Sequence, residues 1–362
     1  MKFQASRSEL AEAATWVARA IRHNTSMPVL SGMIIDVGES IKLSAFNYES
    51  MHQAVVGATI GEPGKVLVPG QAVASFLSAL RGATVDIELD NNELTIASRA
   101  SRARFPILNL EDYPTRPMVS EGQSAVVESA DLVGAVASLG PLTSRDNDQG
   151  LWATSLRILG NTEPAGLKIY GGTRYAMGRT FIPCEVGSEF ELLVPLRLLS
   201  DAVRDMSGLI TLGHDAGNAY LSNGTRATVI RLYEADYPRV DYLFTMEAAF
   251  TTKIDKEALA GTLKLISTAG DQARLHLNGA ELELTSRDSR NGEQGVVNDA
   301  IEVDGEGSRT LVASLKYLQP IVAGLSDEVL ELDALKGRTV GVRDSKTHYV
   351  FQTLTPSEDS RV

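Results

Sequence analysis

The chain has 362 residues, of which 43% are hydrophobic and 22% are charged. This composition is typical of a globular protein of two or three domains and excludes a collagen-like or disordered chain. No apolar run approaches the roughly 18 residues of a membrane helix, and no apolar stretch follows the first residues as in a signal peptide. The single cysteine, Cys184, excludes an internal disulfide and favours a reducing, cytoplasmic location.

The net charge of −12 opposes binding to nucleic acid, because an acidic surface repels backbone phosphates. A nucleic-acid role therefore requires that the basic residues gather on one face of the molecule. The alternative to a nucleic-acid role is that the negative charge only keeps the protein soluble.

A short strand followed by a helix opens the chain, and the same pattern recurs twice. The first helix begins with Ser6 and has Glu9 three residues later, which is the pattern of a capping box. The three predicted strand and helix starts are Lys2–Ala5 with Ser6–Leu10, Ala125–Glu128 with Ser129–Leu132, and Phe250–Ile254 with Asp255–Leu259.

A second pattern, an apolar strand that runs directly into an amphipathic helix, also occurs three times. Its copies are Val66–Leu77, Leu192–Val203 and Thr310–Leu318. In the first two copies a proline, Pro69 or Pro195, stands at the predicted helix start, where its missing N–H costs nothing. The copies are 126 residues apart (Pro69 to Pro195) and 118 residues apart (Pro195 to Ala313).

A third pattern closes the first two units. Asp-Tyr-Pro ends at Pro114 and again at Pro238, 124 residues later, and an alternating, hairpin-like stretch precedes each copy. The matching stretch at Thr339–Leu354 lacks this closing motif. The agreement of the three spacings predicts three domains of one α+β architecture, 1–120, 121–247 and 248–362, each with two helices on antiparallel sheets.

The predicted helices have an apolar face and a face that carries several cations. In the first helix the core stripe is Leu10, Ala13, Ala14, Val17 and Ile21. The exposed faces of the helices carry Arg19, Arg22, Arg81, Arg197, Arg204, Lys256, Lys264 and Lys316. For any single residue an ordinary solvated surface explains the charge equally well, but the recurrence favours a function. No motif reads bases, which suits loose, sequence-independent contact with phosphates.

Four segments carry a resemblance to a known family. They are Met27–Gly32, which contains Pro-Val-Leu, Gln149–Ala153 around Leu151, Tyr170–Ala176, and the closing Asp236–Pro238. With the three repeats, they make the whole chain similar to the bacterial DNA sliding clamps, the beta subunits of DNA polymerase III.

The resemblance implies a non-catalytic processivity factor without a cofactor or membrane attachment. We expect a head-to-tail homodimeric ring around double-stranded DNA, bound without sequence specificity. Its expected partners are a clamp loader, the replicative polymerase and other proteins with clamp-binding peptides. The implied subunit interface joins Phe105 and Ile107 to Leu265 and Ile266 of another copy. The implied DNA-facing residues are the eight cations above together with Arg145.

The resemblance also implies a peptide-binding cleft between the second and third domains. Its expected lining is Leu151, Tyr170, Gly172, Thr173, Arg174, Tyr175, Pro238, Leu243, Val350, Gln352 and Leu354. The sequence departs from the family where Thr becomes Tyr170 and Leu becomes Tyr175, and the family's C-terminal Met-Pro-(Met/Val)-Arg-Leu is replaced by Gln352–Thr355 and a polar tail from Pro356. These departures predict a narrowed cleft, and one interpretation is a diverged or inhibitor-resistant second clamp.

An enzyme and a protein-binding scaffold are the two alternative classes. An enzyme lacks support, because the five histidines are scattered and no nucleotide loop or nucleophile motif is present. A protein-binding scaffold built from the same repeats remains an alternative. The basic helix faces distinguish the two, since a scaffold has no need of them.

Overall fold

A computed structural model of the chain describes residues 1–22, 27–90, 92–117, 124–288, 298–304 and 307–354. The polar tail from Pro356 therefore lies outside the described residues. By internal contacts the chain forms two compact units: unit 1 is Met1–Ala130 with Arg197–Leu232, and unit 2 is Asp131–Leu196 with Tyr233–Val362. The six α-helices of the described residues are α1 (Arg7–Ala18), α2 (Gly70–Ala79), α3 (Ser129–Leu139), α4 (Leu196–Val203), α5 (Lys256–Ile266) and α6 (Leu315–Gly324).

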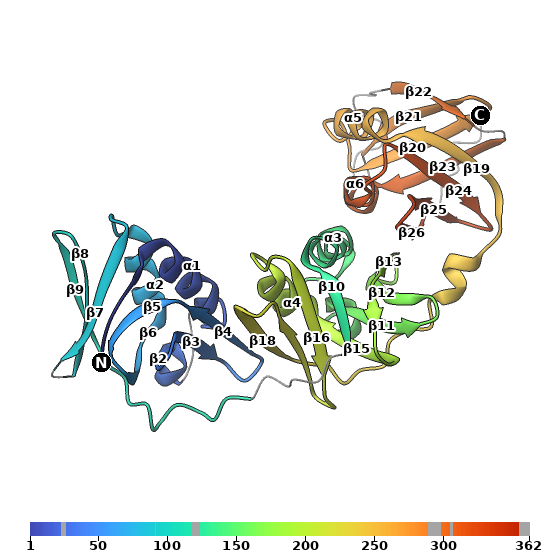
Figure 1. Cartoon of the computed structure of the whole chain (residues 1–362). Coiled ribbons are helices and arrows are strands. Elements are labelled where there is room, and N and C mark those ends of the chain that lie inside the picture. Colours follow the sequence, from blue (N-terminus) through green and yellow to red (C-terminus); the bar gives the residue numbers. More distant parts are fainter. Residues whose placement is uncertain (23–26, 91, 118–123, 289–297, 305–306, 355–362) are drawn as a thin grey trace. The chain divides into compact units, whose positions relative to one another are not determined.

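Unit 1 contains two antiparallel sheets beside α1 and α2 (Figure 1). One has the order β5-β1-β7-β8-β9 and the other contains the run β10-β16-β17-β18-β4-β3-β2-β6. The strands of the first repeat are β1 (Lys2–Ser6), β2 (Gly32–Val37), β3 (Ile41–Phe46), β4 (Ser50–Val56), β5 (Ala58–Glu62), β6 (Gly64–Pro69), β7 (Thr84–Asp90), β8 (Glu93–Ser98) and β9 (Ser101–Pro106). Those of the second repeat in this unit are β10 (Ala125–Glu128), β16 (Leu209–His214), β17 (Asn218–Ser222) and β18 (Arg226–Arg231).

Unit 2 is built on one long antiparallel sheet with the order β15-β11-β12-β13-β26-β25-β24-β19-β22-β21-β20-β23. Its second-repeat strands are β11 (Ser155–Thr162), β12 (Ala165–Gly172), β13 (Ala176–Pro183) and β15 (Phe190–Pro195), beside the short β14 (Glu185–Val186). Its third-repeat strands are β19 (Ala248–Asp255), β20 (Gln272–Asn278), β21 (Glu281–Arg287), β22 (Asn298–Asp304), β23 (Ser308–Ser314), β24 (Val329–Leu335), β25 (Thr339–Arg343) and β26 (Thr347–Gln352).

The strand-then-helix patterns of the sequence are confirmed, and every residue of the predicted core stripe of the first helix is buried. The stripe is shorter than predicted, because α1 ends at Ala18 and Ile21 lies beyond it. The capping-box prediction is wrong, because Ser6 makes no side-chain cap bond and its hydroxyl lies 3.2 Å from that of Ser8. A side-chain cap instead opens α5, where Asp255 accepts a hydrogen bond of 2.7 Å from the backbone of Ala258. Pro69 precedes α2 as the last residue of β6 and does not start the helix.

In each unit the sheet passes from one repeat to the next. In unit 1 the fourth strand of the first repeat, β4, pairs with the last strand of the second, β18, with Met51 opposite Val229. In unit 2 the fourth strand of the second repeat, β13, pairs with the last strand of the third, β26, with Met177 opposite Val350. We call these the two repeat junctions. The same pair of strand positions therefore joins consecutive repeats at both places.

The three-domain division remains a prediction, and its first boundary lies in residues 118–123, outside the described part of the chain. The two compact units divide the second repeat between them, because each junction holds part of that repeat against a neighbour. Among the helices that the structure describes, none is long and apolar enough to cross a membrane.

Candidate functional site

Three of the predicted cations come together in unit 1, beside the end of α1. Arg19 donates to the backbone carbonyls of Asp201 (3.3 Å) and Arg204 (3.1 Å) and forms an ion pair with Asp205. Its side chain is only 20% exposed. Arg19 therefore ties the first repeat to the loop after α4, and its guanidinium is committed to that contact.

The other two cations share one carboxylate. Arg22 forms an ion pair with Glu49, and Arg197 donates to the same carboxylate at 3.0 Å. Arg197 also lies 3.9 Å from Asp201, one turn along α4. These pairs are solvent-exposed, so they contribute little to stability but compensate much of the local positive charge.

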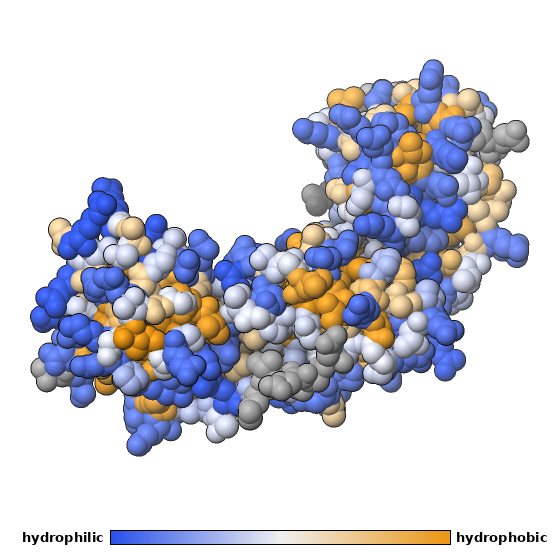
Figure 2. All heavy atoms as spheres, viewed as in Figure 1, coloured by the Kyte–Doolittle hydropathy of each residue, from blue (hydrophilic) through white to orange (hydrophobic). Residues whose placement is uncertain are grey.

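The remaining predicted DNA-facing residues are spread along the chain. Lys256 is half-buried and donates to the backbone carbonyl of Leu325, so its ammonium faces the fold and not open solvent. The exposed ones are Arg81 after α2, Arg145 after the 3₁₀ turn η2 (Gly140–Leu142), Arg204 after α4, Lys264 in α5 and Lys316 in α6. Hydrophilic residues cover most of the visible face in the space-filling view (Figure 2).

An aromatic pair anchors the junction of unit 1. Trp16 is 1% exposed and donates from its indole to the carbonyls of Ala202 (3.2 Å) and Arg204 (3.1 Å). His52 stacks on this indole at 4.5 Å between ring centroids, and its Nδ1 lies 3.2 Å from the carbonyl of Trp16. Burial lowers the pKa of His52 to about 4, so the imidazole is neutral at pH 7.

The residues predicted to line a peptide cleft lie in unit 2, and two of them belong to a buried cluster. The cluster combines Tyr170, Met177 and Val350 from the sheet with Val240 and Phe244 from the segment around the 3₁₀ turn η4 (Asp241–Thr245). Tyr170 and Val350 are 0% and 2% exposed. These two predicted lining residues therefore belong to the interior of the unit.

Arg157 is a member of this site that the sequence did not single out. Its guanidinium lies 5.7 Å from the Tyr170 ring centroid and 5.4 Å from that of Tyr237, and it donates to Glu191 at 2.7 and 3.2 Å. The hydrogen bond that Arg157 donates to Glu191 raises the pKa of the guanidinium further above its usual value. The alternation of side chains along β11 is consistent with Arg157 on the face of the sheet that carries Tyr170. Nothing in the sequence indicates that two aromatic rings flank it.

The Tyr170 hydroxyl donates to the carboxylate of Asp241 at the start of η4. Burial, together with this bond, raises the pKa of Tyr170 well above 10. The Tyr170 ring also meets Phe244 edge-on at 5.8 Å. The ring is thus held at its base by packing and at its tip by a charged acceptor.

Other residues of the predicted cleft are accessible. Tyr175 is 47% exposed and its ring lies 6.3 Å from that of Tyr317, with Arg174 at 5.9 Å from the Tyr175 ring. Of the other predicted lining residues, Leu151, Pro238 and Leu243 are half-buried, Gly172 and Thr173 are buried, and Gln352 and Leu354 are exposed.

The four predicted interface residues lie in two places. Phe105, in β9, and Ile107, just after it, are half-buried, and the Phe105 ring meets Phe76 edge-on at 5.7 Å. Leu265 is 47% exposed on α5, whereas Ile266 is 0% exposed and belongs to the core of unit 2. Only Leu265 of the α5 pair is available for contact with another molecule.

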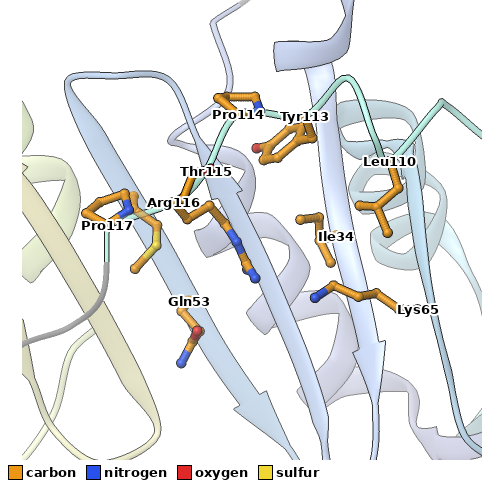
Figure 3. Close-up of a pocket in the computed structure, with 10 residues that line it drawn as sticks. Ile34, Gln53, Lys65, Leu110, Tyr113, Pro114, Thr115, Arg116 and Pro117 are labelled. Carbon is orange, nitrogen blue, oxygen red and sulfur yellow. The ribbon is translucent and has the colours of Figure 1, made fainter.

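Unit 1 has an open pocket of about 520 Å³ near its own Asp-Tyr-Pro motif (Figure 3). Tyr113 fixes this segment, because its hydroxyl accepts from the backbone of Phe46 at 2.8 Å. The lining is Ile34, Met51, Gln53, Lys65, Leu110, Tyr113, Pro114, Thr115, Arg116 and Pro117. The pocket borders the junction strand β4, as the Tyr170 cluster borders β13.

Comparison with known proteins agrees with this architecture. Residues 1–117 match the family model "DNA polymerase III beta subunit, N-terminal domain". The chain is 25% identical to the beta sliding clamp of Micrococcus luteus over 83% of this chain and 98% of that protein. It is 28% identical to the beta sliding clamp homolog GriR of Streptomyces muensis over 74% of this chain and 73% of that protein.

The fold is also similar to a solved clamp, that of Helicobacter pylori bound to a DNA ligase peptide. The TM-score is 0.89 at 16% identity, over 98% of this chain and 100% of that chain. With the three-fold repeat of strand and helix patterns and the two sheet junctions, these matches make the chain similar along its length to the bacterial beta sliding clamps, the beta subunits of DNA polymerase III.

Proposed function

We propose that the chain is one subunit of a DNA sliding clamp, a non-catalytic ring that encircles duplex DNA and tethers other proteins to it. The observation that carries this proposal is the repeated junction. Each junction joins the fourth strand of one repeat, β4 or β13, to the last strand of the next, β18 or β26. One strand of each kind is left over: β9, the last of the first repeat, and β22, the fourth of the third.

The two left-over strands have edges that suit each other. In the described structure β9 pairs with β8 alone, and residues 298–302 of β22 pair with β21 alone. An unpaired strand edge is a hazard unless a partner covers it. The exposed charges on β9 are Arg102 and Arg104, whereas those on β22 are Glu302 and Asp304. Opposite charges favour the pairing of β9 in one copy with β22 in another.

Two such contacts close a head-to-tail ring of two subunits. A hollow of about 840 Å³ beside β22 is bordered by four acidic residues, Asp255, Glu302, Asp304 and Glu331, and by one lysine. The basic edge of β9 is a suitable occupant. Phe105, Ile107 and Leu265 supply apolar area at its margins, and Ile266 supports α5 from within the fold.

A closed ring holds DNA by topology, so its contacts with phosphates can be weak. This suits a chain of net charge −12 in which Arg19, Arg22 and Arg197 are already partly neutralised by carboxylates. We assign the loose phosphate contacts to the exposed cations Arg81, Arg145, Arg204, Lys264 and Lys316. Base-specific contacts are not needed, since sliding requires equal affinity for all sequences.

The proposed partners are a clamp loader, the replicative polymerase and other proteins that carry clamp-binding peptides. The support is the match of residues 1–117 to the family model, the similarity to beta sliding clamps, and the solved clamp bound to a DNA ligase peptide. A cytoplasmic location fits a DNA-bound role and the half-buried free thiol of Cys184. The similarity to the homolog GriR supports a diverged second clamp as a more specific form of the proposal.

Native mass measured by light scattering tests ring formation. One chain weighs 38.9 kDa, so a ring of two weighs twice that. Changing Arg102 and Arg104 to Glu is expected to give monomers. Changing Glu302 and Asp304 to Arg is expected to give monomers as well. Mixing the two variants is expected to restore dimers, because each brings the complement of the other. A wild-type chain that stays monomeric at every concentration would overturn the ring.

Retention on circular DNA tests the inner surface and separates the clamp from a protein-binding scaffold. Changing Arg204, Lys264 and Lys316 to Gln should speed loss from nicked circular DNA, and the effect should shrink as salt rises. The matched control changes Lys2, Lys42 and Arg231 to Gln, three exposed cations on strands. Equal retention of both triple variants and the wild type would reject these helices as the DNA-facing surface.

A further inference from the structure

The two junctions have equivalent positions that differ in one decisive side chain. Opposite Met51 and Met177, the neighbouring strands carry Phe46 and Gly172. Two residues away on these strands, Ser44 lies opposite Gln53 in unit 1, and Tyr170 lies opposite Arg179 in unit 2. Ser44 and Tyr170 are therefore structural counterparts within one chain.

The same register relates a second pair of residues. Ser44 lies opposite Ile34 on β2, and Tyr170 lies opposite Arg157 on β11. In unit 1 the small Ser44, which accepts from Arg116, leaves the open pocket of about 520 Å³ that Ile34 and Gln53 border. In unit 2 the aromatic ring and the guanidinium occupy the corresponding space. Two equivalent positions of one chain can therefore be compared: the one at Ser44 borders an open pocket, and the one at Tyr170 is filled by side chains.

Several contacts hold Tyr170 in the filled position. Its hydroxyl is bonded to Asp241, its ring meets Phe244 edge-on at 5.8 Å, and Arg157 lies against it at 5.7 Å. Arg157 is itself held by Glu191. No part of this arrangement depends on a bound molecule, because every partner belongs to unit 2.

We propose that Tyr170 is the specificity-determining residue of the peptide cleft: it closes the deep apolar part and excludes peptides that must bury a large apolar side chain there. The inference rests on the proposed clamp function and concerns the choice of peptide partner. A peptide must either displace the ring or bind through the accessible outer residues around Tyr175.

Displacement of the ring reduces the apparent affinity by the fraction of molecules that are open. Opening breaks a hydrogen bond to a charged carboxylate and exposes apolar surface, which corresponds to about a tenfold to hundredfold loss of affinity. A side chain as small as Ser44 at this position leaves no such barrier.

Fluorescence anisotropy with a labelled peptide tests the proposal. The probe is the DNA ligase peptide that the Helicobacter pylori clamp binds, with that clamp as the positive control. Tyr170→Ser installs the residue of the first repeat and is expected to bind at least about tenfold more tightly than the wild type. Tyr242→Ser removes a tyrosine that is 64% exposed on the same η4 turn, and it should bind as the wild type does.

Asp241→Ala is a second variant that releases the hydroxyl without emptying the interior, since the Asp241 side chain is 61% exposed. It is expected to bind with intermediate affinity, and it keeps the proposal testable if Tyr170→Ser unfolds. Equal binding by the wild type and both variants, or no binding by any of them, would overturn the assignment of Tyr170.

Native mass and retention on circular DNA are measured on the same samples. If dimers and retention persist while the peptide result fails, only the role of Tyr170 is rejected. If the wild type forms no dimers and is not retained on DNA, the proposed clamp function is rejected. The role of Tyr170 in choosing clamp partners is then rejected with it, because it rests on that function.

Discussion

Replacing His52 should reduce the acid sensitivity of unit 1 between pH 7.5 and pH 5. The imidazole is 1% exposed and stacks on Trp16, and burial lowers its pKa from 6.5 to about 4, with a smaller contribution from Arg19. The folded state therefore disfavours the protonated form. His52 therefore leaves the free energy of unfolding unchanged above pH 6.5 and lowers it as the pH falls from 6.5 to 4. Below pH 4 its effect on that free energy stays constant.

The size of the effect follows from the shift in pKa. At about 1.4 kcal/mol per unit, His52 protonation costs about 2 kcal/mol at pH 5 and about 3 kcal/mol below pH 4. His52→Asn is uncharged at every pH, and its amide can donate to the Trp16 carbonyl in place of Nδ1. The loss of unfolding free energy between pH 7.5 and pH 5 should therefore be about 2 kcal/mol smaller in this variant.

Urea unfolding followed by tryptophan fluorescence measures the difference. A Trp152→Phe background leaves Trp16 as the reporter, because the chain has two tryptophans. Protein concentration is kept equal, since dimer formation also affects stability. His348, whose pKa burial likewise lowers to about 4, is present in both proteins and cancels. Identical pH dependence in the two proteins would refute the reasoning.

Two further substitutions test contacts of unit 2. Tyr349→Phe removes the hydroxyl that donates to the Ser138 carbonyl at 3.0 Å and leaves a buried acceptor unpaired, so thermal unfolding should show a loss of about 1–3 kcal/mol. Tyr242→Phe is the exposed control, and a loss of similar size there would contradict the explanation. Asp255→Ala removes the cap of α5 and should cost roughly 1 kcal/mol in urea unfolding, while Asp255→Ser should restore most of it.

Periodicity and repeat spacing predicted the local elements well. All six predicted helices form, and the residues of the α1 core stripe are buried, because helix period and apolar burial are properties of a short stretch of sequence. Capping was less predictable. Ser6 precedes a helix as predicted but makes no cap bond, since the backbone N–H groups of a first turn can be satisfied in other ways.

The candidate site depended on contacts between distant segments, which spacing alone did not reveal. Tyr170 could be named as a departure from the family, but its bond to Asp241 joins residues 71 apart. Likewise the sequence predicts Arg19 as an exposed cation, whereas its hydrogen bonds to the carbonyls of Asp201 and Arg204 form only in the folded junction. The role of Arg157 could not be predicted from the sequence, because it depends on the packing of β11 and η4 against the same residue, Tyr170.

The two junctions also solve one packing problem differently. In unit 1 His52 on β4 reaches the Trp16 carbonyl of α1, opposite Thr228. In unit 2 the long side chain is on the opposite strand, because Tyr349 of β26 donates to the Ser138 carbonyl. Tyr349 pairs with Gly178 of β13, where an added Cβ would lie 2.7 Å from the tyrosine ring. The sequence repeats preserve the strand pattern, but the pairing of large and small residues is visible only across the junction.

The passage of each sheet from one repeat to the next bears on how the chain can be divided. A fragment that ends near residue 120 leaves β4 without β18, and one that begins near residue 248 leaves β26 without β13. Both cuts expose the edge of a strand of six or seven residues that carries buried apolar side chains, which invites aggregation. Single repeats of this protein should therefore be poor candidates for expression on their own, although each contains its own helices and most of its own sheet.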